Sequence, residues 1–533
     1  MPHNVPFKAL LIAGLVIVSP LASAASTLVF CSEGSPAGFD PGLYSTGTDF
    51  DASAQTVFNR LVQFERGSTE VVPALAERWE VSADGLQYTF HLRHGVKFHS
   101  TDYFTPSRDF NADDVLFTFQ RMLNPNHPFR LAAPGEFPYF TSMGLDSNIT
   151  AVEKLGTDRV RFTLANVDAA FIQNLAMSFA SIHSAEYADT LLASGKATQL
   201  NQKPIGTGPF VFKRFQKDAQ IRFAGNPHYW KPEDVKVDNL VFSINTDASV
   251  RAQKVKAGEC QATLHPRPAD LPGLQQQANL QVLSQPGFNL GYLAYNVTHP
   301  PFDQVQVRRA LDMAINKPAI IQAVFQSAGQ LAVNAMPPTQ WSYDTGIKGQ
   351  PYDPEKARSL LRAAGVKEGT EVSLWAMPVQ RPYNPNAKLM AQMIQQDWAA
   401  VGINVRIVSF EWGEYIKRAK AGEHDAVLIG WTGDNGDPDN WLGTLYGCAA
   451  IDGNNYSRWC DSAYDKAVTD AKRTTDRTRR TALYQQAQQR LAEQVPISPI
   501  AHSTVYQPLS KQVQGFKISP FGVTSFSGVS LTP

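Results

Sequence analysis

The chain has 533 residues, of which 43% are hydrophobic and 18% charged. A chain of this length exceeds one hydrophobic core, so we expect two or three domains. Its formal net charge is zero at pH 7 and it contains no block of basic residues, which argues against nucleic acid or an anionic membrane as a partner.

The N-terminus is typical of an exported protein. Lys8 precedes an apolar run at residues 9–18, and Ala22, Ser23 and Ala24 form the small-residue pattern that signal peptidase cleaves. We therefore predict a signal peptide at residues 1–24, cleaved after Ala24, and an exported mature protein. The apolar run is too short to span a bilayer, and no later stretch reaches about 18 apolar residues.

The first half of the mature chain is rich in β-patterned runs. Residues 87–92, 159–164 and 240–244 are short runs of this kind, and Gly, Pro and Asp clusters separate them. This pattern predicts mixed β structure with antiparallel sheets.

Longer helices follow from about residue 303. Asp353, Pro354 and Gly365 have the positions of an N-cap, an N1 proline and a C′ glycine around one of these helices. We further predict helices at 386–400 and 412–421, strands at 403–410 and 426–429, and a last helix at about 476–494 before a polar, β-like tail. This alternation predicts an α/β unit, in which ligands gather beyond the carboxyl ends of strands.

The run 430–441, directly after one predicted strand, holds three aspartates between tryptophans and no Lys or Arg. An acid beside aromatic surface suits a ligand that carries a positive charge and an apolar body. A surface turn that uses Asp, Asn, Gly and Pro explains the same residues. Asp434 is our candidate ligand, whereas Asp437 and Asp439 shape the turn and Trp441 packs beneath it.

A second unusual segment, residues 374–386, holds Arg381 in a stiff loop with three prolines. An Arg guanidinium can donate two parallel hydrogen bonds to the carboxylate of a ligand. A structural ion pair within the protein is the alternative interpretation of Arg381. If both loops face one cleft, they suit a small zwitterion, with Asp434 on its ammonium and Arg381 on its carboxylate. The termini of an extended dipeptide lie about 7 Å apart, so a fixed spacing would exclude longer peptides.

The sequence offers little support for an enzyme. It contains no G-x-S-x-G elbow, no H-E-x-x-H and no Walker loop. We interpret His424 as a solvated turn residue, and the aspartates at 434, 437 and 439 lack the order of a calcium loop. We expect no catalytic residue, no cofactor and no metal.

Four cysteines in an exported chain predict two disulfides, for which three pairings are possible. A bridge between Cys448 and Cys460 would close a short loop and contribute on the order of 3 kcal/mol. Cys31 and Cys260 would close a long one.

The Arg381 segment and the acidic run also resemble a known family. Residues 375–386 and 430–440 closely resemble the periplasmic dipeptide-binding proteins of bacterial peptide ABC importers. The blocks 73–80, 95–99, 110–115 and 204–210 resemble the signature of the peptide and nickel solute-binding superfamily, also called solute-binding protein family 5. The resemblance covers essentially the whole mature chain.

The resemblance implies an α/β fold, a two-lobed class II clamshell of the three-domain peptide-binding type with mixed sheets. Lobe I would span 25–285, with an extra β-rich subdomain at about 58–200, lobe II would span 286–504, and 505–533 would return to lobe I. Such a monomer would bind dipeptides and deliver them to an inner-membrane ABC permease with cytoplasmic ATPases. Tripeptides, longer peptides, cell-wall peptides and haem are the alternative ligands of the superfamily.

The resemblance also implies roles for single residues. It assigns the peptide ammonium to Asp434 and the peptide carboxylate to Arg381. It pairs Cys31 with Cys260 and Cys448 with Cys460. Ser45-Thr46-Gly47 departs from the Thr-Ser-Gly of familiar relatives, so its hydrogen bonds to the peptide main chain stay open. The remaining predicted pocket residues are Trp412, Trp431, Thr432, Gly433 and Tyr383.

Overall fold

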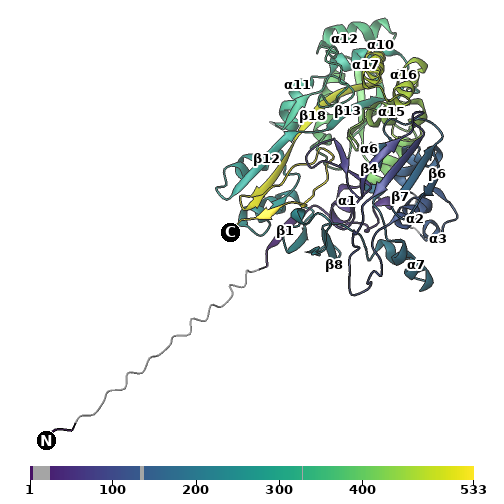
Figure 1. The fold of residues 1–533 in the computed structure, drawn as a ribbon. Coiled ribbons are helices and arrows are strands. Elements are labelled where there is room, and N and C mark those ends of the chain that lie inside the picture. The colour runs from purple at the N-terminus through teal and green to yellow at the C-terminus, as the bar shows by residue number, and fades with distance from the viewer. Residues whose placement is uncertain (4–24, 133–136, 327, 533) are drawn as a thin grey trace.

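The computed structural model describes residues 1–3, 25–132, 137–326 and 328–532 (Figure 1). The predicted signal peptide lies outside the described residues except for 1–3, and so does its cleavage site after Ala24. Across the described ranges, no helix combines the length and the apolar character needed to cross a membrane.

A 12-stranded sheet runs through the molecule in the order β16-β15-β17-β13-β18-β11-β1-β10-β9-β8, with β12 and β14 also paired to β18. Its strands are β1 (Thr27–Ser32), β8 (Phe210–Gln216), β9 (Gln220–Gly225), β10 (Asn239–Ile244), β11 (Ala262–Thr263), β12 (Leu280–Pro286), β13 (Asn289–Tyr295), β14 (Gly329–Leu331), β15 (Thr370–Trp375), β16 (Ile403–Val408), β17 (Ala426–Thr432) and β18 (Ile497–Ser510).

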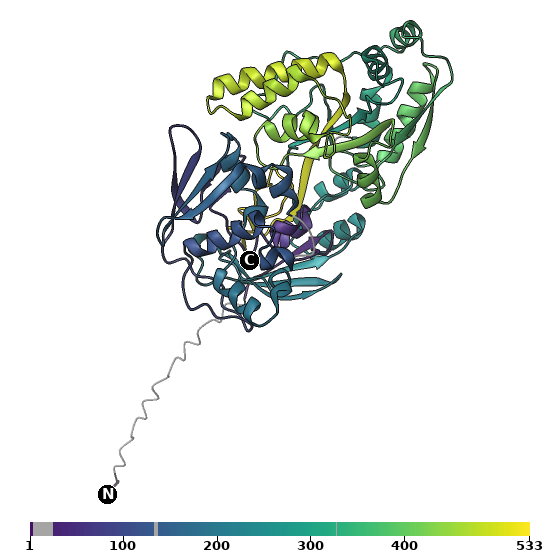
Figure 2. The ribbon, with the colours of Figure 1, turned by 90° about the vertical axis from the view of Figure 1, so that its right-hand side faces the viewer.

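Strand β18 joins the two halves of this sheet. Its residues up to Ser503 pair with β13 and β14, and those from Thr504 onward pair with β12 and β11. In Figure 2 this yellow strand runs from the green upper part of the molecule into the purple and teal lower part. The predicted β-like tail is therefore a bridging strand, whereas the exact lobe boundaries stay predictions.

A separate four-stranded antiparallel sheet has the order β4-β5-β7-β6. Tyr88, Phe90 and Leu92 of β5 are buried at every second position, as expected for a strand with one face on the core. Phe119 of helix α2 (Ala112–Leu123) packs edge to face against Phe162 of β7, with ring centroids 4.8 Å apart. The bounds are β4 (Ala76–Val81), β5 (Gln87–Leu92), β6 (Ile149–Lys154) and β7 (Arg159–Leu164), with two small pairs, β2 (Val62–Phe64) with β3 (Val71–Pro73) and β19 (Val513–Gln514) with β20 (Ser530–Leu531).

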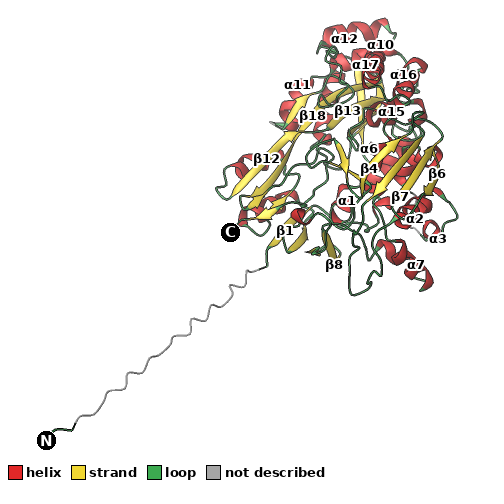
Figure 3. Cartoon of the chain, in the orientation of Figure 1, coloured by secondary structure: helices red, strands yellow, loops and turns green. Residues whose placement is uncertain are grey.

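The helices cover both halves of the large sheet (Figure 3). They are α1 (Gly47–Ala52), α2 (Ala112–Leu123), α3 (Pro128–Leu131), α4 (Pro138–Ser142), α5 (Leu145–Asn148), α6 (Phe171–Leu175), α7 (Ala185–Ala193), α8 (Ala248–Ala257), α9 (Leu271–Gln275), α10 (Val305–Ala314), α11 (Lys317–Ile320), α12 (Pro354–Ala363), α13 (Ala387–Ala399), α14 (Trp412–Lys420), α15 (Asp439–Tyr446), α16 (Ser462–Lys472) and α17 (Arg477–Gln494). As predicted for α12, Asp353 accepts a bond from the Lys356 N–H and Gly365 has φ +75°.

The predicted α/β unit positions both candidate loops. Strand β15 pairs in parallel with β16 and with β17, so the carboxyl ends of β15 and β17 meet at one edge of the sheet. The Arg381 loop follows β15, and the loop with Asp434 follows β17. Strand β17 continues to Thr432, three residues beyond its predicted end.

Both predicted disulfides are present. The Cα atoms of Cys31 and Cys260 are 5.7 Å apart, and those of Cys448 and Cys460 are 4.8 Å apart. The pairing implied by the resemblance is therefore confirmed.

Candidate ligand-binding site

A cavity of about 1000 Å³ lies between the two halves of the chain. It is lined by nine of the ten residues predicted for the site: Ser45, Thr46, Gly47, Arg381, Tyr383, Trp412, Trp431, Thr432 and Asp434. Gly433, the tenth, lies under the surface, where its N–H donates to the Phe288 carbonyl at 2.9 Å. A Cβ at Gly433 would lie 2.2 Å from the Phe288 ring, so this glycine serves packing.

Asp434 is half-buried, and its carboxylate accepts two hydrogen bonds. Tyr139 donates to its Oδ1 at 2.8 Å and Asn440 Nδ2 to its Oδ2 at 3.0 Å. Burial raises the pKa of Asp434 to about 6, against the two hydrogen bonds, which lower it. Among the described residues no Lys, Arg or His comes within ion-pair distance of this carboxylate, so a ligand ammonium would be its first positive partner.

Tyr139 was missed by the sequence analysis. It belongs to α4, nearly 300 positions before Asp434 in the chain, and nothing in its local sequence distinguishes it from a core aromatic. Its hydrogen bond connects the N-terminal part of the chain to the loop after β17. Burial and the Asp434 charge both raise the pKa of Tyr139, so it stays a donor.

Arg381, like Asp434, has no counter-ion among the described residues. Its guanidinium lies 5.3 Å from the centroid of the Trp412 ring, and Nη1 donates to the Gln380 carbonyl at 3.1 Å. Within the described chain no carboxylate lies in ion-pair range of Arg381. The alternative of a structural ion pair is thus not observed, and the fork is available to a carboxylate.

Two facing glycines allow the Arg381 loop to lie on the strands beneath it. Gly291 of β13 and Gly430 of β17 are register partners. A Cβ at Gly291 would lie 2.1 Å from the Tyr383 carbonyl oxygen, and one at Gly430 would lie 2.2 Å from the Tyr383 ring. The loop with Arg381 therefore packs directly on the strand that leads to Asp434.

The rest of the acidic run serves structure, as predicted. Asp437 is buried and pairs with Arg480 at 2.8 Å. Asp439 pairs with Lys472 at 3.1 Å. Trp441 is fully buried beneath the loop.

The interpretation of His424 as a solvated turn residue is wrong. Its side chain is fully buried, and Nε2 lies 2.8 Å from the Tyr456 carbonyl oxygen. Burial lowers the pKa of His424 to about 4. The Trp375 ring packs against it, a contact that local sequence could not reveal. In the part of the chain that is described, no cluster of His, Cys, Asp or Glu could hold a metal ion.

The opposite wall of the cavity carries Ser45, Thr46 and Gly47. Thr46 is the N-cap of α1, and its hydroxyl donates to Asp49 Oδ2 at 2.5 Å. The side chain of Thr46 is therefore committed to α1.

Comparison with known proteins decides the family. The family described as "Bacterial extracellular solute-binding proteins, family 5 Middle" matches residues 70–453. The chain belongs to this family. It is 73% identical over 533 residues to the "Dipeptide-binding protein" of Pseudomonas aeruginosa and 72% identical over 533 residues to "Di/tripeptide-binding protein 3" of the same species, with 100% of each chain covered in both cases.

A solved structure supports the fold. The dipeptide binding protein of Pseudoalteromonas sp. SM9913, in complex with Met-Leu, superposes with a TM-score of 0.86 at 39% identity. The match covers 95% of this chain and 100% of that one. The predicted fold class, a mixed α/β solute-binding clamshell of this family, is confirmed.

Proposed function

We propose that this family 5 protein binds dipeptides through both termini. One observation carries the proposal: Asp434 and Arg381 line the same cavity, and neither has a counter-ion among the described residues. A desolvated charge needs an opposite charge and hydrogen bonds. The ammonium and carboxylate of a dipeptide supply both.

The cellular role follows from the family and from the N-terminus. The protein would be exported by its signal peptide, cleaved after Ala24, and would work in the periplasm as a monomeric binding protein. Ligand binding would favour a closed form, which an inner-membrane ABC permease with cytoplasmic ATPases would recognise. The names of the P. aeruginosa relatives support dipeptides, with tripeptides as a second size class.

Calorimetry of ligand-stripped protein tests the two anchors. We expect Arg381→Ala and Asp434→Ala each to weaken dipeptide binding at least about tenfold, because each leaves a desolvated terminus unpaired. Arg479→Ala and Asp189→Ala, which remove exposed charges, are the matched controls and should bind normally. Unchanged affinity in both site variants would refute the assignment.

Two further measurements separate the alternatives. Incubation with dipeptides should release no free amino acids, whereas a hydrolase would release them. A thermal-shift screen with di-, tri- and tetrapeptides and haem should show stabilisation by the shorter peptides. Stabilisation by haem and by no peptide would contradict the proposal.

A further inference from the structure

Three neighbouring parallel strands of the lower sheet half end at the cavity. Strand β1 pairs in parallel with β10 on one side and with β11 on the other. The residues that follow them, Glu33 after β1, Asp247 after β10 and His265 after β11, all line the cavity. The carboxyl ends of parallel strands are where α/β sheets bind ligands.

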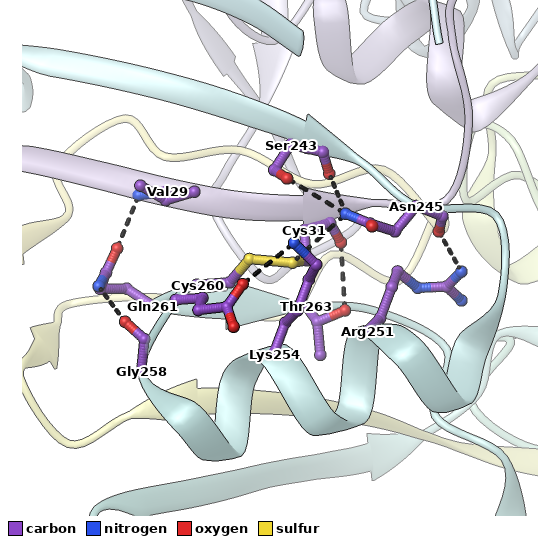
Figure 4. The surroundings of a disulfide bond; sticks show 11 residues. Val29, Cys31, Ser243, Asn245, Arg251, Lys254, Gly258, Cys260, Gln261 and Thr263 are labelled. Carbon is purple, nitrogen blue, oxygen red and sulfur yellow. Dashed lines mark hydrogen bonds and ion pairs between the residues drawn. A yellow bond between two sulfur atoms is a disulfide. The ribbon is translucent and has the colours of Figure 1, made fainter. Parts of the chain in front are cut away.

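Glu33 and His265 lie side by side. Cys31 and Thr263 are register partners in β1 and β11, and Glu33 and His265 each come two residues later. A disulfide joins Cys31 of β1 to Cys260, two residues before β11, and Thr263 Oγ1 donates to the Cys31 carbonyl at 3.1 Å (Figure 4). The backbone that leads to Glu33 and His265 is therefore held together by a disulfide and a hydrogen bond.

The backbone holds His265 in an uncommon conformation, with φ +48°. Few non-glycine residues adopt this region, and they persist where the surroundings over-determine them. On one side Arg251 Nη2 donates to the Leu264 carbonyl at 3.5 Å, and on the other Arg267 pairs with Asp270 at 2.8 Å. Such bracing at a cavity wall is typical of a functional position.

Neither oxygen of the Glu33 carboxylate has a partner among the described residues, whereas Asp247 uses one oxygen, Oδ1, as the N-cap of α8. The Asp247 carboxylate accepts from the N–H groups of Ser249 and Val250. Arg251 Nη1 is committed to the carbonyls of Asn245 and Thr246 at 2.8 and 2.9 Å. No hydrogen bond or ion pair joins the side chain of Glu33 or His265 to any other residue that the structure describes.

Glu33 and His265 lie near Arg381, the residue that we expect to bind the carboxylate of the ligand. Burial is the largest effect on the pKa of His265 and lowers it. The positive charges of Arg251 and Arg381 lower this pKa further, whereas the negative charge of Glu33 raises it. His265 is thus neutral near pH 7. It adds a hydrogen-bonding group and no charge to the carboxylate of Glu33.

We propose that Glu33 and His265 form a subsite for the side chain of the ligand's C-terminal residue, and that this subsite favours a cationic side chain such as Lys or Arg. The inference rests on the proposed function, because Arg381 must hold the adjacent carboxylate. A cationic side chain would give Glu33 the partner that no described residue provides.

Calorimetry with Ala-Lys, Ala-Met and Ala-Glu tests the subsite. The wild-type protein should bind Ala-Lys more tightly than Ala-Glu. Glu33→Gln should weaken Ala-Lys binding at least about fivefold and Ala-Met binding less than about twofold. His265→Asn, which tolerates a positive φ, should weaken Ala-Lys in the same selective way. Glu65→Gln removes another carboxylate of the cavity wall and should leave the selectivity unchanged.

Several results would overturn the subsite. The first is that the wild-type protein binds Ala-Glu as tightly as Ala-Lys, or more tightly. The second is that Glu33→Gln weakens the binding of Ala-Lys and Ala-Met equally. The third is that Glu65→Gln changes the selectivity as much as Glu33→Gln does. The wild-type comparison holds even if a variant fails to fold. Failure of the proposed function is distinct, since the wild-type protein would then bind none of the three dipeptides.

Discussion

Asp434 combines three properties that suit an ammonium ligand: burial, two neutral hydrogen-bond donors, and no cationic partner in the described part of the chain. Its donors are Tyr139 and Asn440. Burial raises the folded pKa to about 6, above the value of about 3.9 for an unfolded Asp. Folding therefore disfavours the ionised carboxylate. The resulting loss of stability is zero below the unfolded pKa and reaches its full size above pH 6. A bound ammonium would offset it.

This pKa predicts a pH dependence of binding. From pH 7.5 to pH 5 the carboxylate of the empty protein takes up a proton, so dipeptide affinity should fall by about tenfold. Calorimetry across this range measures the effect. Asp434→Asn should bind weakly with a flat profile, and a profile parallel to that of the wild-type protein would refute the assignment to Asp434.

At the scale of elements, the site depends on how closely the loop after β15 approaches β13 and β17. Gly291 and Gly430 face one another in these strands, and Tyr383 rests on both. Any Cβ at either position would lift Tyr383 and with it Arg381.

Gly291→Ala should therefore weaken dipeptide binding at least about tenfold, because Arg381 moves away from the ligand carboxylate. Gly156→Ala is the matched control. A Cβ there meets only Asp158 Oδ1 at 3.3 Å, so binding should not change. Calorimetry measures both variants, and normal affinity of Gly291→Ala would contradict the packing argument.

At the scale of the whole molecule, contacts join the N-terminal part of the chain to the loop after β17 and to α16. The Ala169 N–H donates to the Lys472 carbonyl at 2.9 Å, and Asn435 Nδ2 donates to Asn174 Oδ1 at 2.6 Å. Lys472 also pairs with Asp439. Burial raises the pKa of Asp168 to about 6, and the charge of Lys472 opposes this rise. Because these contacts join the N-terminal part of the chain to the loop after β17 and to α16, we infer that they stabilise the closed form.

Removal of the Lys472 charge should favour opening. We expect Lys472→Met to weaken dipeptide binding several-fold, because the ligand must then drive closure against a less stable closed form. Lys466→Met, which removes an exposed pair with Asp470 on the same helix, should have no effect. Calorimetry with small-angle scattering of the ligand-free protein measures both changes. Normal affinity and an unchanged radius of gyration in Lys472→Met would exclude this role.

Much of the site could be predicted from local sequence. Arg381 and Asp434 each follow a strand in one α/β unit, and the order of those elements is visible in the residues. Tyr139 and the Glu33–His265 pair were missed, because long-range pairing of α4 with the loop after β17, and of β1 with β11, brings them to the cavity. His424 was misjudged for the same reason, since distant aromatic residues bury it.

Blocked dipeptides test the central claim most directly, because they remove one charged terminus and leave the rest of the ligand intact. Calorimetry would compare Ala-Phe with N-acetyl-Ala-Phe and with Ala-Phe amide. Two-ended recognition by Asp434 and Arg381 predicts that each block weakens binding at least about thirtyfold. Binding of either blocked form within about twofold of free Ala-Phe would contradict it.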